Sequence, residues 1–467
     1  MKVQNQMQLD LGFLQRDSAE HEEYAEALSS HTPKAYTKDN AGSLMECVIS
    51  LSNMQKAFKK VARNKGAQGI DERSIEDTRA WLKDHYETLR EELREGRYKP
   101  QPTKRVYIPK DGGGTRGLSI PTVIDRIIQQ AIVQVLTPLY EVQFSETSYG
   151  FRPNKSAHRA IYELKRLSDE GYSYATSIDI KSYFDTLNHN LLLEIVRRTV
   201  KDKELVGLIK KYLKAGVLEN GVVIKTNKGT PPQGGNLSPL LANIYLNEFD
   251  QEMERRHNKY IRYADDIIVL SKSKAAAQQK MHSSCSYLEN KLKLTTNKDK
   301  TKVVKVYYHR FKFLGFTLGK RKDTTEIRIH KSAVTKAKQK LRELTKRNRG
   351  KNVRAVMGEL KVFLRGWINY FKIAKLKTKL EQLNGWLRRR IRMYIWKQWK
   401  RVRTRIKNLK RFGASPEDAI KWGNIRKGYW RIAASQVLTT TLTNDVLAEL
   451  GYFNSCEYFK IQSEALA

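Results

Sequence analysis

The 467-residue chain is poor in cysteine and has no long apolar run. Its three cysteines, Cys47, Cys285 and Cys456, are far apart and form no CxxC pair. This spacing argues against a disulfide framework or a structural zinc site and fits a reducing compartment such as the cytoplasm. No run of about 18 apolar residues is present, so we expect no transmembrane helix and no membrane partner. The first residues, Met1 to Leu9, are too polar for a signal peptide.

Acidic residues are scarce relative to basic ones. The chain has 49 Asp and Glu against 88 Lys and Arg, a formal net charge of +39. Such an excess repels itself in a compact protein, so a neutralising polyanion is expected. We favour nucleic acid, because each Lys or Arg set against a phosphate releases a condensed counterion. Composition alone leaves a solubilising surface or an anionic membrane open as alternatives.

The basic residues gather in one segment. Residues 331–411 hold 28 Lys and Arg against three Glu, about 25 of the 39 net charges. We expect this segment to be mostly helical, with breaks near Arg349-Gly350 and Asn384-Gly385. Its apolar residues at 391, 395, 399, 402, 406 and 409 predict one stripe of a helix. The rest of that helix would be a cationic surface, since no acid lies between Arg388 and Arg411.

From about residue 46 the chain alternates between helical and strand-like patterns. The segment from Arg126 to Tyr140 has the apolar spacing of a helix. Two short β-branched runs, Tyr174 to Ile180 and Ile267 to Leu270, are typical of strands. The predicted fold class is therefore α+β.

The segment Tyr263-Ala264-Asp265-Asp266 carries the most chemical information. It lies between a charged stretch and an apolar β-like run, which predicts the turn of a hairpin. Two adjacent aspartates at a turn repel each other unless water or cations neutralise them. Taken alone, a simple acidic turn explains this segment better than a catalytic site does.

Two upstream segments change that interpretation. Asp179 ends an apolar strand-like run, and the segment from Gly229 to Gly235 is a Pro/Gly-rich turn followed by an apolar helical start. The order is strand with Asp, Gln-Gly-Gly turn with helix, then Tyr-x-Asp-Asp hairpin. This order resembles motifs A, B and C in the palm of reverse transcriptases.

Primer extension explains why such residues are needed. A 3′-hydroxyl attacks a phosphate while pyrophosphate leaves, and two Mg²⁺ ions about 3.5–4 Å apart stabilise both oxygens. Mg²⁺ prefers hard carboxylate oxygens and keeps waters and phosphates as further ligands. We predict Asp179 and Asp265 as bridging ligands, Asp266 as the third carboxylate, and Ile180 as a further member of the metal site. For Asp185, a helix cap or a fold-stabilising acid is the better explanation.

A wider resemblance covers about Asn53 to Gly319. Over this range the chain resembles the conserved blocks of bacterial group II intron reverse transcriptases. The matching blocks are NKGAQGID (64–71), YIPKDGGGTRGLSIPTVIDRIIQQAI (107–132), YGFRPNKSAHRAI (149–161), DIKSYFDTLNH (179–189), PPQGGNLSPLLANIYL (231–246), YADD (263–266) and FKFLGFTLG (311–319). One block would be weak support, whereas seven in the family's order are highly specific.

Two later segments resemble the maturase, or X, signature of the same family, which other reverse transcriptases lack. They are FLRGWINYF (363–371) and LNGWLRRRIRMYIWKQWK (383–400). The alternative for this block is a basic thumb that only clamps the template–primer duplex. The resemblance implies that several residues bind primer, template or intron RNA: Tyr263, Gly315, Arg388, Arg389, Arg390, Arg392, Lys397 and Lys400.

The family also implies residues that bind the incoming nucleotide. Phe184 matches an aromatic steric gate that clashes with a ribose 2′-hydroxyl, although packing alone could explain a Phe there. Gln233, with Gly234 and Gly235, should let the backbone approach the nascent base pair and the incoming nucleotide, because the two glycines have no Cβ. Lys104 and Arg116 are expected to bind the triphosphate, and Arg suits bidentate phosphate contact.

The implied architecture is a right-hand polymerase fold. We expect an N-terminal extension over residues 1–45, fingers and palm with an antiparallel sheet over 46–322, a helical thumb and maturase domain over 323–412, and a small helical DNA-binding region over 413–467. The chain departs from the family's GTPQGG by an additional Pro231. It ends at Ala467 without paired cysteines, which resembles the short class that lacks an HNH endonuclease domain.

The implied activity is RNA-directed DNA synthesis with two Mg²⁺ ions, joined to maturase action in splicing and retrotransposition. The expected partners are group II intron RNA, an RNA template with a DNA primer, dNTPs and target DNA, in the bacterial cytoplasm at the nucleoid. Two alternatives remain open. One is a host-adopted reverse transcriptase in repair or defence, and the other is an RNA chaperone without catalysis.

Overall fold

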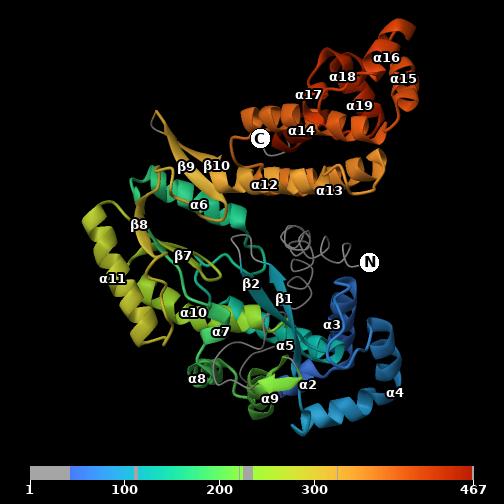
Figure 1. Ribbon diagram of the computed structural model, residues 1–467. Helices are drawn as coiled ribbons and strands as arrows, with labels where there is room; N and C mark the ends of the chain where they lie inside the picture. The colour runs from blue at the N-terminus through green and yellow to red at the C-terminus, as the bar shows by residue number, and fades with distance from the viewer. Residues whose placement is uncertain (1–42, 110–113, 220, 225–234, 323, 465–467) are drawn as a thin grey trace. The chain divides into compact units, whose positions relative to one another are not determined.

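The computed structural model describes residues 43–109, 114–219, 221–224, 235–322 and 324–464 (Figure 1). Nearly all of the predicted N-terminal extension lies outside these residues. The chain divides into two compact units, with the boundary between Lys305 and Val306. In the described part of the chain, no helix has the length and apolar character needed to span a membrane.

The first unit contains most of the strands. Its helices are α2 (Leu44–Val48), α3 (Leu51–Arg63), α4 (Ile75–Arg94), α5 (Val123–Glu141), α6 (Ala157–Asp169), α7 (Tyr183–Thr186), α8 (His189–Thr199), α9 (Lys203–Lys214), α10 (Ser238–Arg255) and α11 (Lys274–Asn290). Its strands are β1 (Thr103–Pro109), β2 (Thr115–Ile120), β3 (Tyr174–Ile178), β4 (Val217–Glu219), β5 (Val222–Ile224), β6 (Lys259–Tyr263), β7 (Asp266–Ser271) and β8 (Lys302–Lys305).

Four antiparallel strands in the order β6-β7-β3-β8 form what we call the central sheet. The predicted strands at 174–180 and 267–270 are confirmed as β3 and β7. All residues of β7 after Asp266 are buried, so this strand is covered on both faces. Helix α11 packs against β3, β7 and β8 (Figure 1).

A second sheet of this unit has the order β2-β1-β4-β5. Strands β1 and β2 form an antiparallel hairpin, and β1 also pairs in parallel with β4. The hairpin carries the predicted triphosphate-binding residues Lys104 and Arg116, and the residues 110–113 that connect its strands lie outside the described part of the chain.

Helix α5 confirms the helix predicted from Arg126 to Tyr140 and is buried along most of its length. The Thr122 side chain caps it by accepting from the backbone N–H of Asp125. Asp125 is itself buried and accepts hydrogen bonds from the hydroxyls of Tyr98, Tyr212 and Thr122. Burial raises the pKa of Asp125, and these donors oppose that rise. The carboxylate thereby ties α5 to α9 and to the segment after α4.

The second unit is a hairpin followed by helices. Its strands are β9 (Phe316–Arg321) and β10 (Thr324–Ile329), and its helices are α12 (Lys331–Leu344), α13 (Val353–Phe371), α14 (Lys377–Gln398), α15 (Val402–Arg411), α16 (Pro416–Gly423), α17 (Tyr429–Ile432), α18 (Gln436–Thr441), α19 (Asn444–Glu449) and α20 (Ser455–Glu464). One hydrophobic core joins Leu360 and Leu387 to Ile432, Leu438 and Leu447. The segment after residue 412 therefore shares a core with the helices before it, and the predicted boundaries at 322 and 412 stay predictions.

The helix breaks are confirmed in one place and wrong in another. Helix α12 ends and α13 begins on either side of Arg349-Gly350, as predicted. Helix α14, however, runs through Asn384-Gly385, and the apolar stripe from 391 to 409 belongs to two helices, α14 and α15.

Tertiary contacts explain the continuous helix. The Asn384 side chain is buried, and its Oδ1 accepts hydrogen bonds from Tyr452 Oη at 3.0 Å and Ser455 Oγ at 2.7 Å. These bonds join α14 to the start of α20 and outweigh the local tendency of Asn-Gly to end a helix.

The neighbouring residues Asn384 and Gly385 offer a matched pair of substitutions that tests the role of the Asn384 hydrogen bonds. Asn384→Ala leaves two buried hydroxyls without their acceptor and should lower the free energy of unfolding by about 1–3 kcal/mol. Gly385→Ala, at an exposed helix position with open space around it, should be neutral or stabilise by about 0.5–1 kcal/mol. Urea unfolding monitored by circular dichroism measures both. Equal effects of the two substitutions would contradict the role of Asn384.

Candidate active site and nucleic-acid surface

The predicted Tyr-x-Asp-Asp hairpin is present. Tyr263 at the end of β6 pairs with Asp266 at the start of β7, so Ala264 and Asp265 form a two-residue turn. Ala264 has a φ of 55°, as tight hairpin turns require at this position. Asp266 is exposed, Asp265 is half-buried and Ala264 is buried.

The first predicted carboxylate lies at the same end of the central sheet. Ile178 in β3 pairs with Ile267 in β7, so Asp179 directly follows one partner and Asp266 directly precedes the other. Antiparallel partners have Cα atoms about 4.5–5.5 Å apart. Strand register therefore brings the backbones of Asp179, Asp265 and Asp266 together, although the three are distant in sequence.

The end of β3 is anchored by a following loop. The backbone N–H of Asp179 donates to Thr301 Oγ1 at 3.2 Å, and its carbonyl accepts from Asn297 N–H at 2.7 Å. Ile180 makes an isolated bridge with Thr296. The Asp179 carboxylate pairs with Lys300, whose Nζ lies 3.5 Å from Oδ2.

These residues fit a divalent cation in chemical type. Among the described residues, no three His, Cys, Asp or Glu side chains are grouped closely enough to hold a metal ion by themselves. Mg²⁺ does not need such a cage, because substrate phosphates and water complete its shell around one or two carboxylates. Asp179 already attracts a cation, and its exposed pair with Lys300 is weak, about 0–1 kcal/mol, so a metal ion could displace the ammonium group.

The predicted gate lies just beyond Asp179. Tyr183 and Phe184 begin the short helix α7, and their rings meet edge to face with centroids 5.3 Å apart. Tyr183 is buried and donates to the carbonyl of Ala242 in α10 at 2.6 Å. Phe184 is half-buried beside the core, so packing and a gate are both compatible with its place. Its role stays a prediction.

Gln233 and Gly234 lie outside the described residues, but the residues after them are held by α5. Gln130 Oε1 accepts from Asn236 Nδ2 at 3.0 Å, and Gln129 Oε1 lies against Gly235, where a Cβ would collide with it. Sequence reasoning missed both glutamines. Two adjacent polar residues inside the otherwise apolar run from Ile127 to Val133 were the signal that could have found them.

Lys104 and Arg116 occupy opposite ends of the β1–β2 hairpin. Lys104 pairs with Ile120 and Arg116 pairs with Ile108, four residue pairs away. At the usual rise, this separation is about 13 Å along the strands. Their shared contact with one triphosphate stays a prediction.

In the second unit, the predicted primer-grip turn is a tight turn. Leu314 and Gly315 have φ values of 48° and 83°, between the bridging residues Phe313 and Phe316. The Leu314 carbonyl accepts from Tyr370 Oη at 2.9 Å, and a Cβ on Gly315 would crowd the Phe371 ring. Only a residue that tolerates positive φ and this close approach fits there.

The arginines of α14 make structural contacts that the sequence did not reveal. Arg389 donates to the Trp430 carbonyl and lies 4.0 Å from the centroid of its ring, Arg390 donates to Thr345 Oγ1, and Arg392 donates to the Leu442 carbonyl. Burial, helped by neighbouring arginines, lowers the pKa of Arg390 and of Arg392. Their RNA-binding role stays a prediction, and part of their contribution is to hold helices together.

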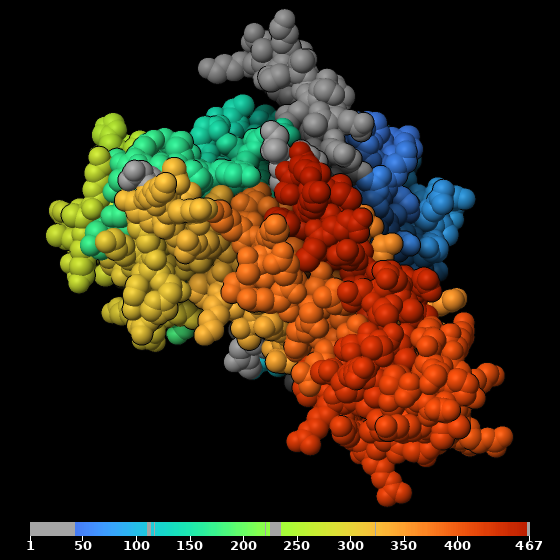
Figure 2. Space-filling model, turned by 90° about the horizontal axis from the view of Figure 1, so that it is seen from above, coloured from blue at the N-terminus to red at the C-terminus, as the bar shows by residue number. Residues whose placement is uncertain are grey.

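The other predicted basic residues of this unit differ in exposure. Lys400 is exposed and Lys397 lies 5.4 Å from the centroid of the Tyr429 ring, whereas Arg388 is half-buried. In the space-filling view, long side chains of the orange-red segment stand out into solvent (Figure 2). The exposed basic residues between the end of α14 and the end of α15 are Lys400, Arg401, Arg403, Lys407, Lys410 and Arg411.

Two protein families match parts of this chain. The family described as reverse transcriptase (RNA-dependent DNA polymerase) matches residues 108–318. The family described as group II intron, maturase-specific domain, matches residues 334–413.

Individual relatives cover different shares of the chain. Protein YkfC of Escherichia coli (strain K12) is 37% identical over 58% of this chain and 80% of YkfC. The group II intron-encoded protein LtrA of Lactococcus lactis subsp. cremoris is 36% identical over 55% of this chain, and the match spans only 42% of LtrA. A solved partial Cas6-RT-Cas1–Cas2 complex aligns at 24% identity with a TM-score of 0.35, over 54% of this chain and 43% of that chain.

An aspartate at the end of one strand beside a Tyr-x-Asp-Asp hairpin, in a chain matched by that polymerase family, defines a reverse transcriptase. The match to the maturase-specific domain then shows which kind of reverse transcriptase this is. The chain belongs to the family of group II intron-encoded reverse transcriptase/maturases.

The gate assignment can be tested directly. Phe184→Val shortens the side chain that would meet a ribose 2′-hydroxyl, so the preference for dNTP over rNTP should fall by about tenfold or more, since one hydrophobic contact is worth about 1–3 kcal/mol. Single-nucleotide primer extension with each nucleotide measures this ratio. Leu191→Val in α8, outside the predicted nucleotide contacts, serves as the control. An unaltered ratio of dNTP to rNTP use in the Phe184 variant would contradict the assignment of Phe184 as the steric gate.

Proposed function

We propose that this protein copies RNA into complementary DNA at the end of the central sheet and that its second unit binds group II intron RNA as a maturase. The observation that carries the catalytic part is the register that sets Asp179 beside the Tyr263–Asp266 hairpin. The basic surface of the helical second unit supports the RNA-binding part.

In this proposal the central sheet holds the reacting groups. Two Mg²⁺ ions, bound by Asp179, Asp265 and Asp266 with Ile180, would neutralise the attacking and leaving oxygens of nucleotidyl transfer. Lys104 and Arg116 bind the triphosphate, and Phe184 excludes the ribose 2′-hydroxyl. Gln233 and Gly234 contact the nascent base pair, and Tyr263 and Gly315 contact primer and template.

The partners follow from the same proposal. The substrates are an RNA template, a DNA primer and dNTPs, and the RNA ligand is a group II intron that the protein helps to splice and to insert into target DNA. We place this activity in the cytoplasm at the nucleoid. A host-adopted role without an intron is less favoured, because the chain retains a maturase-specific segment.

The catalytic assignment predicts loss of synthesis when a ligand is removed. Asp265→Ala should lower the rate of primer extension on an RNA template at least about 100-fold, the scale expected when one electrostatic contact to the transition state is lost. Chelation of Mg²⁺ should abolish extension by the unaltered protein, and added Mg²⁺ should restore it. Asp84→Asn, an exposed position in α4, is the control. Full activity in the Asp265 variant contradicts the metal assignment.

The RNA-binding assignment predicts different effects on protein stability for exposed basic side chains and for arginines that are hydrogen-bonded to neighbouring helices. Replacing Lys400, Arg401 and Arg403 by Ala should weaken RNA binding and flatten the slope of log affinity against log salt by about 2, without changing the unfolding temperature. Replacing Arg389, Arg390 and Arg392 should weaken binding and also lower the unfolding temperature, because their bonds to neighbouring helices are lost. A salt slope unchanged in the exposed triple variant counts against this surface.

A further inference from the structure

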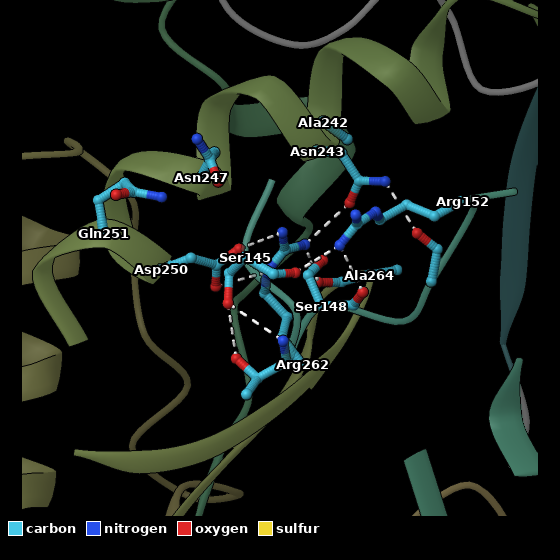
Figure 3. A network of polar contacts seen from close by, with 12 residues as sticks. Ser145, Ser148, Arg152, Ala242, Asn243, Asn247, Asp250, Gln251, Arg262 and Ala264 are labelled. Atoms are coloured by element: carbon cyan, nitrogen blue, oxygen red, sulfur yellow. Dashed lines mark hydrogen bonds and ion pairs between the residues drawn. The ribbon is translucent and has the colours of Figure 1, made fainter. Parts of the chain in front are cut away.

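A buried ion pair lies behind the Tyr263–Asp266 turn. Arg262, the residue before Tyr263 in β6, and Asp250 in α10 are both fully buried. Arg262 Nε donates to both carboxylate oxygens of Asp250 at 2.9 Å, and Nη2 donates to Oδ2 (Figure 3). The guanidinium group is therefore fixed in orientation on one side by a bidentate contact.

The other side of the same guanidinium group reaches the turn. Arg262 Nη1 donates to the carbonyl of Ala264 at 3.2 Å and to Asn243 Oδ1 at 2.9 Å. Asn243 in turn donates from Nδ2 to the carbonyl of Gly150 at 2.8 Å. Helix α10 thus holds both the turn and the segment that packs on it (Figure 3).

The backbone of Arg262 is fixed as well. Its N–H donates to the Thr147 carbonyl at 3.0 Å, and its carbonyl accepts from Tyr149 N–H at 2.8 Å. The chain then reaches Gly150, whose missing Cβ leaves room for the backbone of Ala264 and Tyr263. Any larger residue at 150 would collide with the turn.

Ala264 needs such support because its backbone is strained. A φ of 55° in a residue other than glycine costs about 1–3 kcal/mol and persists only where the surroundings enforce it. Gly150 packs on the N–H side of Ala264, and Arg262 holds its carbonyl. Asp265 follows immediately, so the peptide plane that Arg262 fixes also sets the direction of the Asp265 side chain.

Fold stability alone does not call for this arrangement. Burying two charges is costly, and well-packed apolar residues of similar volume often replace a buried ion pair without loss of stability. We propose that Arg262, oriented by Asp250 and Asn243, is a positioning residue for the polymerase reaction that fixes the Ala264 carbonyl and thereby aims the carboxylates of Asp265 and Asp266. The inference rests on the proposed function, and it concerns buried residues outside the predicted metal and nucleotide contacts.

The test separates positioning from stability. Arg262→Met combined with Asp250→Leu removes both charges together and should keep the protein folded. The single-turnover rate of primer extension on RNA should nevertheless fall about 100-fold, the cost of a displacement of about 1 Å at reacting groups. The active fraction, taken from the burst amplitude, should stay near that of the unaltered protein.

A destabilised control variant comes from the same helix. Leu246→Ala opens a cavity in the core of the first unit and should lower the unfolding temperature. It should reduce the active fraction and leave the single-turnover rate within about twofold of the unaltered protein. A purely structural role for the ion pair would make the double variant behave in the same way as Leu246→Ala.

A second readout does not depend on turnover. Electron paramagnetic resonance can measure Mn²⁺ binding to the complex with RNA template, dideoxy-terminated primer and dNTP. Mn²⁺ should bind about tenfold more weakly to the double variant, because misaimed carboxylates lose metal ligation, while template–primer affinity stays unchanged. Should the double variant not fold, Asn243→Ala, which keeps the ion pair, should show a smaller loss in the same direction.

Two results would overturn the inference. A double variant with an unaltered rate and unaltered Mn²⁺ affinity shows that the turn holds its shape without Arg262. A normal rate with a reduced active fraction shows that the ion pair serves folding alone. If the unaltered protein fails to extend a primer on RNA, the proposed function is contradicted, and the inference that rests on it is contradicted as well.

Discussion

The antiparallel register of β3 and β7 is the constraint on which the candidate site depends. Successive side chains of a strand alternate between the two faces, so a slip of one residue would move Ile178, Ile267 and Val269 away from the main core of the first unit and onto the opposite face of the sheet. The hydrophobic effect therefore enforces the pairing of Ile178 with Ile267. The same pairing sets Asp179 beside Asp266, so burial at the middle of the sheet determines which polar residues meet at its end.

A high density of positive charge distinguishes the second unit. Its helices share one apolar core, yet their arginines crowd closely enough that the charges of Arg342 and Arg347 help to lower the pKa of Arg390. Some of this charge is tied to backbone carbonyls, as at Arg392, and some projects into solvent along α15. The exposed part has few acidic neighbours in sequence, so a bound polyanion relieves repulsion that the fold itself does not cancel.

The sequence predicted those features that short-range patterns determine. The strands predicted at 174–180 and 267–270, the helix predicted from Arg126 to Tyr140 and the Tyr263–Asp266 hairpin follow from periodicity and turn chemistry, which act over a few residues. The features that it did not predict depend on partners far away in the chain. Asn384 continues a helix because residues after 450 bond to it, and Arg389 contacts a carbonyl 41 residues further on. No local sequence pattern identifies contact partners that are so far apart in the chain.

Three unfavourable features of the first unit lie at one place, and this coincidence favours a functional role. A strained alanine, a fully buried ion pair and a glycine in backbone contact meet at Ala264, Arg262 and Gly150. Sequences usually agree with their fold at every level and depart from that agreement at sites where function requires it. Each feature alone would be a modest defect of packing. Together they hold one peptide plane rigidly, and the residue attached to that plane is the aspartate on which polymerisation is proposed to depend.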